Sequence, residues 1–344
     1  MLRSLLGLDW CKSEAHLLFL SKFLHARAAE GFAEADYWQD VLRETPQQAI
    51  KRFIDEGVLV SPGLSEHLAY KYKISELQPM LKQRSLPVSG RKDDLISRLI
   101  EADPGGMKKA VAGLTVLQCS DRGQEIASQY LALKKQRREA AEQEVLVMLQ
   151  KGKFREAGLL VSSYEAKQVF SRGLNMDWKT HDPGRDVSGL ESIFGSKPKI
   201  LARLDQGKLG PLRLAAGMMS LWGTNKARGW LPPGFETGLV MDSDSAARML
   251  LFHARHQADL EKYRKIGAVK SVKILTANDQ RHCEACRELD AKTYKLSEVP
   301  ELPYEKCTSE MGCRCNAVAA EIKVSLSEGL KGVITTRNTK QNRA

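Results

Sequence analysis

The sequence predicts a mainly α-helical, multidomain protein with a small α+β domain near the C-terminus. Aromatic residues make up only 6% of the 344 residues, whereas 42% are hydrophobic and 28% are charged, which is typical of globular helical domains. Apolar residues recur at helical spacing through most of the chain. The alternation typical of a strand stands out at residues 269–275. A chain of this length is expected to form two or three domains.

Composition and pattern together divide the chain into six expected segments. They are a helical, winged-helix-like N-terminal region (1–62), a helix–loop–helix module (63–105), a strand with a long basic helix (106–157), a helical middle domain (158–265), a cysteine-rich α+β domain (266–324) and a flexible basic tail (325–344).

The sequence of the N-terminal region predicts helices followed by a short strand. Ser13 is a candidate N-cap for one helix, and Thr45 with Pro46 opens another. Residues 58–62 then indicate a strand, and residues 114–131 indicate a strand, a turn and a helix. These pieces are similar to fragments of a winged-helix fold that is split by the segment between them. A generic helical scaffold is the alternative.

The segment 73–102 predicts two amphipathic helices joined by a short loop. Pro79 falls within the first of them, and we expect that helix to begin near Glu76 so that the proline lies in the first turn. The apolar positions at helical spacing are Ile74, Leu77 and Leu81 in the first helix and Leu95, Ile96, Leu99 and Ile100 in the second.

The loop places an anion-binding pattern at the start of the second helix. Ser89 is a candidate N-cap, and Gly90 permits close approach of another backbone. Arg91 and Lys92 follow in the first turn, where unpaired N–H groups and the positive end of the helix dipole attract anions. With the preceding Leu-Pro pair, this pattern resembles the SAP domain over residues 66–103.

The SAP resemblance implies a module that binds double-stranded DNA, often AT-rich or without strong sequence preference. Between Lys71 and Ala102, seven Lys or Arg stand against four Asp or Glu, and the whole chain carries a net charge of +11. Such an excess favours phosphate contacts. A plain helical hairpin is the alternative. The DNA-contacting positions that the resemblance implies are Lys82, Arg84, Ser89, Gly90, Arg91, Lys92 and Arg98.

The seven cysteines are unevenly placed, and two of them, Cys11 and Cys119, are isolated. The two-residue gap between Cys283 and Cys286 is the spacing of a zinc knuckle. Because we expect a reducing cytoplasmic environment, the cluster indicates metal rather than disulfides. We expect structural Zn²⁺, held by four of the five clustered cysteines, with Cys315 as the one left out; such an all-cysteine site has no open position for catalysis. The candidate ligands are Cys283, Cys286, Cys307, Cys313 and Cys315.

Residues 265–320 also resemble the C-terminal part of the head-morphogenesis minor proteins of Mu-like phages. The matching residues are Asp279, Arg281, the two cysteines of the zinc knuckle, Leu289-Asp290, and the run Cys313-Arg314-Cys315. The chain departs from that family at Ala291, where glycine is frequent, and before the last cysteines, where a His-Pro pair is frequent. The resemblance implies a phage-related or mobile-element origin.

Acidic and histidine residues elsewhere offer a weaker signal. The groups His181, Asp182 and Asp186, and Asp242 with Asp244, have the residue types of a metal-dependent nuclease, but acids beside Gly, Pro and Ser usually form turns and helix caps. The pair His253 and His256 shares one helix face, and we expect it at the surface.

The expected function is therefore DNA binding without catalysis, with the zinc domain as a structural platform or a second contact for nucleic acid or protein. A DNA nuclease or repair enzyme recruited by the SAP module is one alternative, and a phage head assembly protein is another. No unbroken apolar segment indicates a signal peptide or a membrane span, so a membrane partner is not expected.

Overall fold

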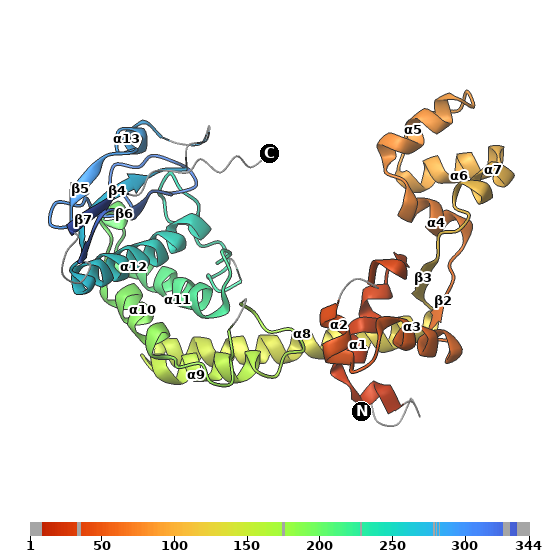
Figure 1. Ribbon diagram of the computed structural model, residues 1–344, viewed down its shortest axis with the longest axis horizontal. Helices are drawn as coiled ribbons and strands as arrows, with labels where there is room; N and C mark the ends of the chain where they lie inside the picture. The colour runs from red at the N-terminus through yellow and green to blue at the C-terminus, as the bar shows by residue number, and fades with distance from the viewer. Residues whose placement is uncertain are drawn as a thin grey trace. The chain divides into compact units, whose positions relative to one another are not determined.

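The computed structural model describes residues 9–32, 36–173, 176–227, 229–277, 279, 281, 283–325 and 331–335. It separates into two compact units, Met1–Glu139 and Ala140–Ala344. Helices predominate in both, and the described residues of each unit include one small antiparallel sheet (Figure 1). The predicted mainly helical fold is confirmed. No helix among the described residues is long and apolar enough to cross a membrane.

An aromatic core organises the start of the first unit. Phe19 and Phe53 are fully buried. The ring of Trp10 lies 4.6 Å from that of Phe53, and the ring of Trp38 lies 4.7 Å from that of Phe19, measured between centroids. The helices around this core are η2 (Asp9–Lys12), α1 (Glu14–Leu20), η3 (Ser21–Phe23), η4 (Glu30–Phe32), α2 (Asp36–Leu42) and α3 (Pro46–Asp55).

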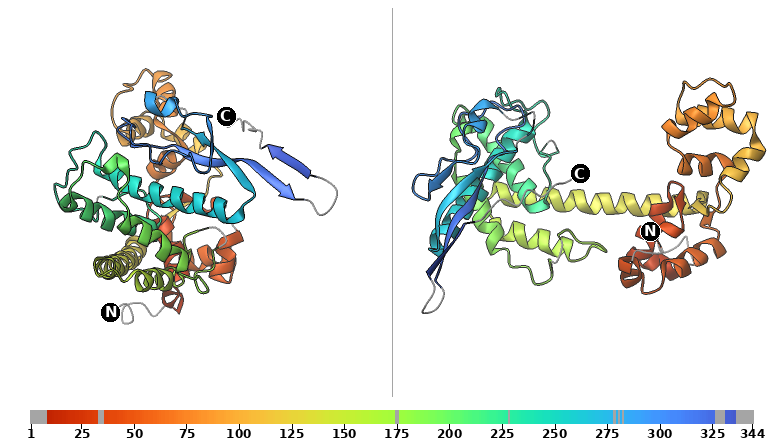
Figure 2. Two further views of the ribbon diagram at one scale, coloured as in Figure 1. Left: turned by 90° about the vertical axis from the view of Figure 1, so that its left-hand side faces the viewer. Right: turned by 45° about the horizontal axis from the view of Figure 1, so that its top comes forward.

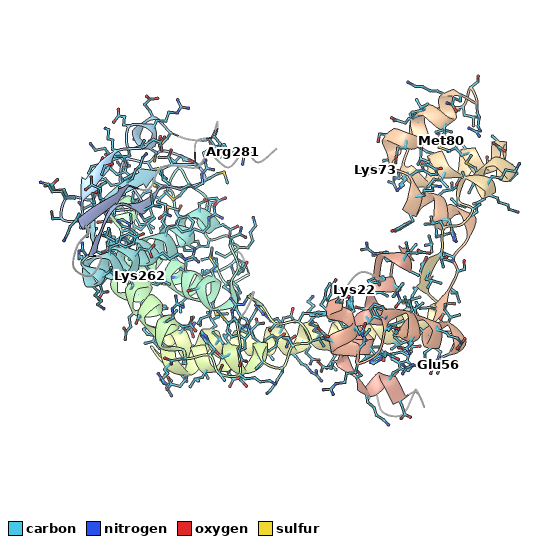
Figure 3. All side chains as sticks on the ribbon, viewed as in Figure 1. Lys22, Glu56, Lys73, Met80, Lys262 and Arg281 are labelled. Atoms are coloured by element: carbon cyan, nitrogen blue, oxygen red, sulfur yellow. The ribbon has the colours of Figure 1, made fainter. Side chains whose placement is uncertain are left out.

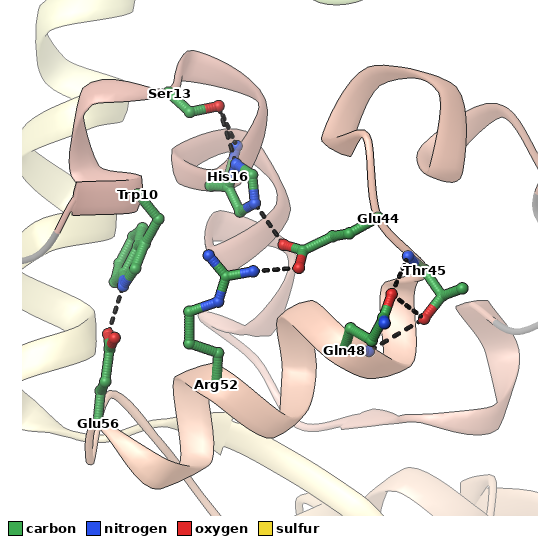
Figure 4. Close-up of polar contacts among 8 residues, drawn as sticks. All are labelled: Trp10, Ser13, His16, Glu44, Thr45, Gln48, Arg52 and Glu56. Atoms are coloured by element: carbon green, nitrogen blue, oxygen red, sulfur yellow. Dashed lines mark hydrogen bonds and ion pairs between the residues drawn. The ribbon is translucent and has the colours of Figure 1, made fainter.

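Side-chain caps begin two of these helices where the sequence predicts them (Figure 4). Ser13 Oγ accepts a hydrogen bond from the backbone N–H of His16 at the start of α1. Thr45 Oγ1 accepts from the N–H of Gln48 at 3.2 Å, and Gln48 Oε1 accepts from the N–H of Thr45 at 2.9 Å. This reciprocal arrangement is a capping box, and it satisfies two N–H groups that the helix itself cannot pair.

A short sheet closes the N-terminal part of the unit. Its strands β1 (Arg27–Ala28), β2 (Leu59–Val60) and β3 (Val116–Cys119) run antiparallel in the order β1-β3-β2. Leu59 pairs with Cys119, and Val60 pairs with Gln118. The chain therefore leaves the sheet after β2 and returns to it at β3. The two strand-containing pieces that the sequence indicates are joined by this pairing, while their winged-helix resemblance stays a prediction.

Four helices form the segment between β2 and β3. They are α4 (Leu64–Lys71), α5 (Ile74–Lys82), α6 (Lys92–Ala102) and α7 (Pro104–Ala110). After β3 the chain enters α8 (Asp121–Gln150), which passes through the boundary between the two units. Figure 2 shows these helices in two further views.

The second unit is a helical layer that carries a sheet. Its helices are α9 (Phe154–Glu165), α10 (Gly184–Gly195), η5 (Lys199–Leu201), α11 (Gln206–Trp222), α12 (Ser243–Ile266) and α13 (Glu284–Arg287). Its antiparallel strands are β4 (Val269–Leu275), β5 (Thr293–Lys295), β6 (Asn316–Ser325) and β7 (Lys331–Thr335), in the order β5-β4-β6-β7. Residues 331–335 of the expected tail thus form a strand, and the rest of that tail after Ser325 lies outside the described residues.

One face of this sheet packs on α12. Val272 and Ile274 of β4 are fully buried, and Ala317 of β6 is nearly so; they share a core cluster with the partly buried Tyr263 of α12. The cysteine-rich loops between β4 and β6 are consequently held against the helical layer. Buried Cys286 and Cys313 belong to the core cluster that also contains buried residues of α11 and α12.

Candidate nucleic-acid interface and metal centre

The helix–loop–helix module has a core of its own. Ile74 is the exception among the predicted apolar positions, because it lies at the first position of α5 and is 44% exposed. The partly buried side chains that pack on the core also come from residues 64–100. The buried core residues are Leu68, Leu77, Leu81, Leu95, Ile96, Leu99, Met107 and Val111.

The first helix of the module begins earlier than the sequence suggests. We expected a start near Glu76, but α5 begins at Ile74, and Pro79 lies in its second turn. Glu76 contributes by accepting a hydrogen bond from the N–H of Lys73 at 2.6 Å, which fixes the start of the helix. A proline at this position removes the bond to the carbonyl of Ser75 and crowds that carbonyl, but Ser75 is exposed and water can satisfy its carbonyl.

The second helix is capped differently from the expectation. Ser89 is not the N-cap; Arg91 occupies that position, and its N–H donates to Asp94 Oδ2 at 2.9 Å. The cap lies two residues later because Gly90 adopts a φ of +129°, which turns the chain before the helix starts. A Cβ at Gly90 would lie 3.1 Å from Asp94 Oδ2, so glycine is needed here for conformation and for space.

Two of the predicted contact residues, Arg98 and Lys92, hold the module together. Arg98 Nη1 donates to the carbonyl of Pro87 at 3.0 Å and to that of Ser89 at 2.6 Å, so it fixes the loop before α6. Lys92 Nζ donates to the carbonyl of Ala69 in α4. These side chains are half-buried, and a charged nitrogen of each already donates to a backbone carbonyl of the chain.

Arg84 has a similar structural role. Its Nη2 donates to Asp103 Oδ2 at 2.6 Å, which connects the end of α5 to the start of α7. This hydrogen bond holds the pKa of the Asp103 carboxyl below its ordinary value. The loss of Arg84 would therefore disturb the module as well as remove a positive charge.

The remaining predicted contacts are open to solvent. Lys82, Ser89, Gly90 and Arg91 are all exposed. In the part of the chain that the structure describes, the side chains of Lys82 and Arg91 make no hydrogen bond or ion pair. Their charges are free to meet a phosphate. Arg91 lies at the start of α6, where backbone N–H groups are unpaired. Lys82 ends α5 and is close in sequence to Arg84, which pairs with Asp103 at the other end of α6.

Comparison with known protein families identifies residues 71–104 as a SAP domain. This match covers α5, α6 and the loop that joins them, and it confirms the resemblance predicted from the sequence. Searches of curated proteins and of solved structures found no match to the chain.

The five clustered cysteines meet in the second unit, and all of them are free thiols. Cys283 Sγ lies 3.7 Å from Cys307 Sγ, and Cys286 Sγ lies 4.0 Å from Cys313 Sγ. Two groups of three sulfurs lie within 4.8 Å of one another: Cys283, Cys286 and Cys307 form one, and Cys286, Cys313 and Cys315 form the other. This cluster has the donor atoms and the spacing to hold a metal ion.

Neighbouring groups fix the position of these sulfurs. The N–H of Tyr304 donates to Cys313 Sγ at 3.2 Å, and the N–H of Cys313 donates to Met249 Sδ of α12 at 3.3 Å. Arg314, between Cys313 and Cys315, donates to both carboxylate oxygens of Asp279, at 2.6 and 2.7 Å. The sequence motif contains Asp279 and Arg314 but does not reveal that they pair across the loop.

The thiols of the cluster differ in how readily they ionise. Burial opposes ionisation of Cys283, yet hydrogen bonds from the backbone N–H groups of Thr308 and Cys286 lower the pKa of its thiol to about 7. The pKa of Cys286 is raised instead, because its thiol shares hydrogen bonds with Cys307 and Cys313. A metal ion would replace the protons that the buried sulfurs otherwise share.

The loop before α13 completes the surroundings of the cluster. The hydrogen bond of Arg314 lowers the pKa of Asp279 to about 2, so this carboxylate is ionised. Arg281, labelled in Figure 3, lies in the same loop, and its carbonyl accepts from Ser309 Oγ at 3.2 Å. Arg281 and Arg314 line a small cavity together with Cys283, Cys286, Cys307 and Cys315. His282 lies outside the described residues.

The carboxylates proposed for a nuclease do not gather at one site. His181 Nε2 lies 2.9 Å from Asp186 Oδ2, whereas Asp242 caps α12 by accepting from the N–H of Ser245 at 2.6 Å. Asp244 is buried and accepts from the N–H of Ala227. Among the described residues, the groups able to hold a metal contain only cysteines.

The two histidines of α12 are buried, which contradicts the expected surface position. His253 is 7% exposed, and its Nδ1 lies 3.2 Å from the carbonyl of Leu302. His256 is 5% exposed. The segment that leads to Tyr304 covers this face of α12, and nothing in the spacing of the two histidines indicates that cover.

Proposed function

We propose that the protein binds double-stranded DNA through its SAP domain. The observation that carries this proposal is the exposed start of α6 at Arg91, a cation with no partner in the described chain at the beginning of an eleven-residue helix. Exposed Ser89 and Gly90 add polar backbone groups beside it. Phosphate oxygens are acceptors with negative charge, and this helix start offers them donors with positive charge. Lys82, at the end of α5, is a second exposed cation without a partner among the described residues.

A module of this size makes only a few phosphate contacts. Non-specific affinity of this kind corresponds to a Kd of roughly 10⁻⁴–10⁻⁶ M at physiological salt. Each phosphate neutralised by Lys or Arg releases counterions, so affinity falls steeply as salt rises. The SAP domain therefore serves to keep the chain on DNA, and we propose no base-specific contact for it.

Charge reversal at Lys82 and Arg91 tests the proposal. We expect the double variant Lys82→Glu with Arg91→Glu to bind a fluorescent duplex at least about tenfold more weakly at low salt, with a shallower salt dependence. The matched control is Lys151→Glu with Lys153→Glu, which changes the charge equally at exposed lysines of the second unit. Equal losses in the two double variants would refute a DNA-binding role centred on the SAP domain.

We further propose that the cysteine cluster binds zinc in a structural role. Four thiolates suit Zn²⁺ because soft sulfur ligands select this ion among the divalent cations common in cells. A short segment rich in loops gains folding free energy from such an ion that it cannot gain from its own small core. The centre would hold the β4–α13 loop and the segment Cys313–Cys315 against α12.

Metal removal tests the zinc proposal. Purified protein should contain zinc by elemental analysis, and a chelator should lower the unfolding temperature of the second unit. Readdition of zinc should restore that temperature. Protein that contains no zinc, and whose unfolding does not respond to zinc or chelator, would contradict the structural role.

We also propose, on the sequence motif alone, that residues 265–320 share an origin with the Mu-like head-morphogenesis proteins. The motif residues Asp279 and Arg281, the cysteines of the zinc knuckle and the run Cys313-Arg314-Cys315 support it. Expression beside its flanking genes provides a test. Co-purification with a capsid or portal subunit would support a role in head assembly, and co-purification with DNA alone would favour the DNA-binding function.

A further inference from the structure

The arrangement of the five sulfurs differs from the single four-cysteine site expected from the sequence. Among the described residues, they form two triads rather than one tetrad. Cys286 is the member that the triads share, and it is only 2% exposed. Cys315, which we expected to be left out of the metal site, is a member of the second triad, just as Cys307 is a member of the first.

Each triad contains one edge of the length that zinc requires. A Zn–S bond of about 2.3 Å in a tetrahedron places neighbouring sulfurs about 3.8 Å apart. The separation between Cys283 and Cys307 is 3.7 Å, and that between Cys286 and Cys313 is 4.0 Å. These two edges belong to different triads, so each triad could hold an ion without a large movement of the chain.

We propose that the centre holds two divalent metal ions bridged by the thiolate of Cys286. One ion is bound by Cys283, Cys286 and Cys307, and the other by Cys286, Cys313 and Cys315. A solvent molecule or another small ligand takes the fourth position of each ion. This inference rests on the zinc proposal above and extends it from one ion to two.

Charge balance favours the second ion. One divalent ion with four thiolates and a protonated fifth thiol carries a net charge of about −2 in a partly buried cluster, whereas two ions with five thiolates carry about −1. The cavity next to the sulfurs is also lined by Arg281 and Arg314. Arg314 is already paired with Asp279, so it does not provide a full compensating charge.

Metal stoichiometry of the wild-type full-length chain is the decisive measurement. We expect two zinc ions per chain by elemental analysis after zinc loading and removal of loosely bound metal. After exchange with cadmium, the ¹¹³Cd NMR spectrum should show two resonances from thiolate-rich sites. One ion and one resonance would overturn the two-ion centre and leave the zinc proposal intact, whereas no bound metal would refute both.

Single substitutions give an independent pattern. Cys286→Ala should remove both ions, whereas Cys283→Ala and Cys315→Ala should each leave one. A single-ion site predicts a different result, because loss of any ligand removes the only ion and loss of the fifth cysteine changes nothing. Cys119→Ala, at a buried cysteine of the first unit, is the control and should retain two ions. Where a variant fails to fold, the wild-type stoichiometry and spectrum still decide.

Discussion

The loop before α6 depends on one residue, Gly90. Its φ of +129° is a conformation that residues with a Cβ rarely adopt, and a Cβ there would also press against Asp94. Asp94 in turn accepts the N–H of Arg91 and so begins the helix. The conformation of a single glycine thus controls the place where we propose that phosphate binds.

We expect Gly90→Ala to lower the free energy of unfolding of the SAP domain by about 1–3 kcal/mol, because the strained backbone must be maintained or abandoned. Urea denaturation followed by circular dichroism measures this. Gly105→Ala is the control, since nothing lies within 4 Å of its Cβ position and its φ is not in the positive region. The control should be neutral or slightly stabilising; equal destabilisation by both would contradict the assigned role of Gly90.

His256 predicts a pH dependence of stability in the second unit. Burial lowers its pKa from 6.5, and the nearby His253 lowers it further, while the carbonyl of Pro300 and the carboxylates of Asp259 and Glu301 oppose the shift. The folded state binds a proton at His256 less well than the unfolded state does. The contribution of His256 to the free energy of unfolding is therefore fully present above about pH 6.5 and is lost as pH falls below it.

The loss can reach at most about 1.4 kcal/mol per pH unit for one proton. Denaturation of wild type and of His256→Gln at pH 7.5 and pH 5.5 measures it, with zinc present throughout. The wild-type protein should lose more stability than the variant between these two values. An equal loss in both would show that other groups cause the pH dependence.

At the scale of secondary structure, helix interiors are easier to predict than the loops between helices. The start of α3 is predictable because Thr45, Pro46 and Gln48 are adjacent in sequence and satisfy one another. The start of α6 is not predictable, because serine is a common N-cap residue and arginine is a rare one, yet Arg91 is the N-cap. The capping hydrogen bond comes from Asp94, which accepts from the N–H of Arg91. The φ of Gly90 determines which of the two residues becomes the N-cap, and this angle cannot be read from the sequence.

The same limit applies to the cysteines and histidines. The spacing of Cys283 and Cys286 predicts a metal site. The grouping with Cys315 depends on where the chain turns after Cys307, which the spacing does not give. The burial of His253 depends on a segment about fifty residues later in the chain, through the carbonyl of Leu302. Contacts of this range are set by the tertiary fold.

The basic side chains of the helix–loop–helix therefore divide into two classes with different consequences. Arg98 fixes the loop through two carbonyl groups, whereas Lys82 has no partner among the described residues. We expect Lys82→Gln to reduce the slope of log affinity against log salt by about 1, as for loss of one phosphate contact. We expect Arg98→Ala to weaken binding mainly by releasing the loop, with a smaller change in slope.

Fluorescence anisotropy over a range of salt concentrations distinguishes the two effects, and denaturation provides a second measurement. Arg98→Ala should destabilise the module, while Lys82→Gln should leave its stability within about 0.5 kcal/mol, as is usual for exposed positions. A change in slope with Arg98→Ala as large as with Lys82→Gln would mean that Arg98 contacts phosphate directly, as the SAP resemblance implied.

For the whole molecule, the main architectural result is that the SAP module is inserted into another fold. Val60 and Gln118 are paired neighbours in the sheet, although the chain between them contains α4 to α7. Among the residues that the structure describes, the buried core of the insertion is formed by residues between Leu68 and Val111. The sheet of the host is likewise completed by strands on either side of the insertion. Each part therefore has the contacts that it needs for its own stability.

This organisation predicts that the module can be removed without loss of the host fold. Replacement of residues 63–114 by Asn-Gly would leave β2 and β3 joined by a short connection, and Asn-Gly favours such a tight turn. The free energy of unfolding of the host should change by no more than about 1–2 kcal/mol, since the closure entropy of a loop varies only slowly with its length. DNA affinity should fall at least to the level of the variant with charges reversed at Lys82 and Arg91. Circular dichroism, thermal unfolding and anisotropy on the same preparation measure the folding, the stability and the DNA affinity of the shortened chain.

A shortened chain that folds and retains wild-type affinity would place the DNA-binding surface in the second unit, where most of the excess positive charge resides. A shortened chain that fails to fold would show instead that the insertion and its host form one cooperative core.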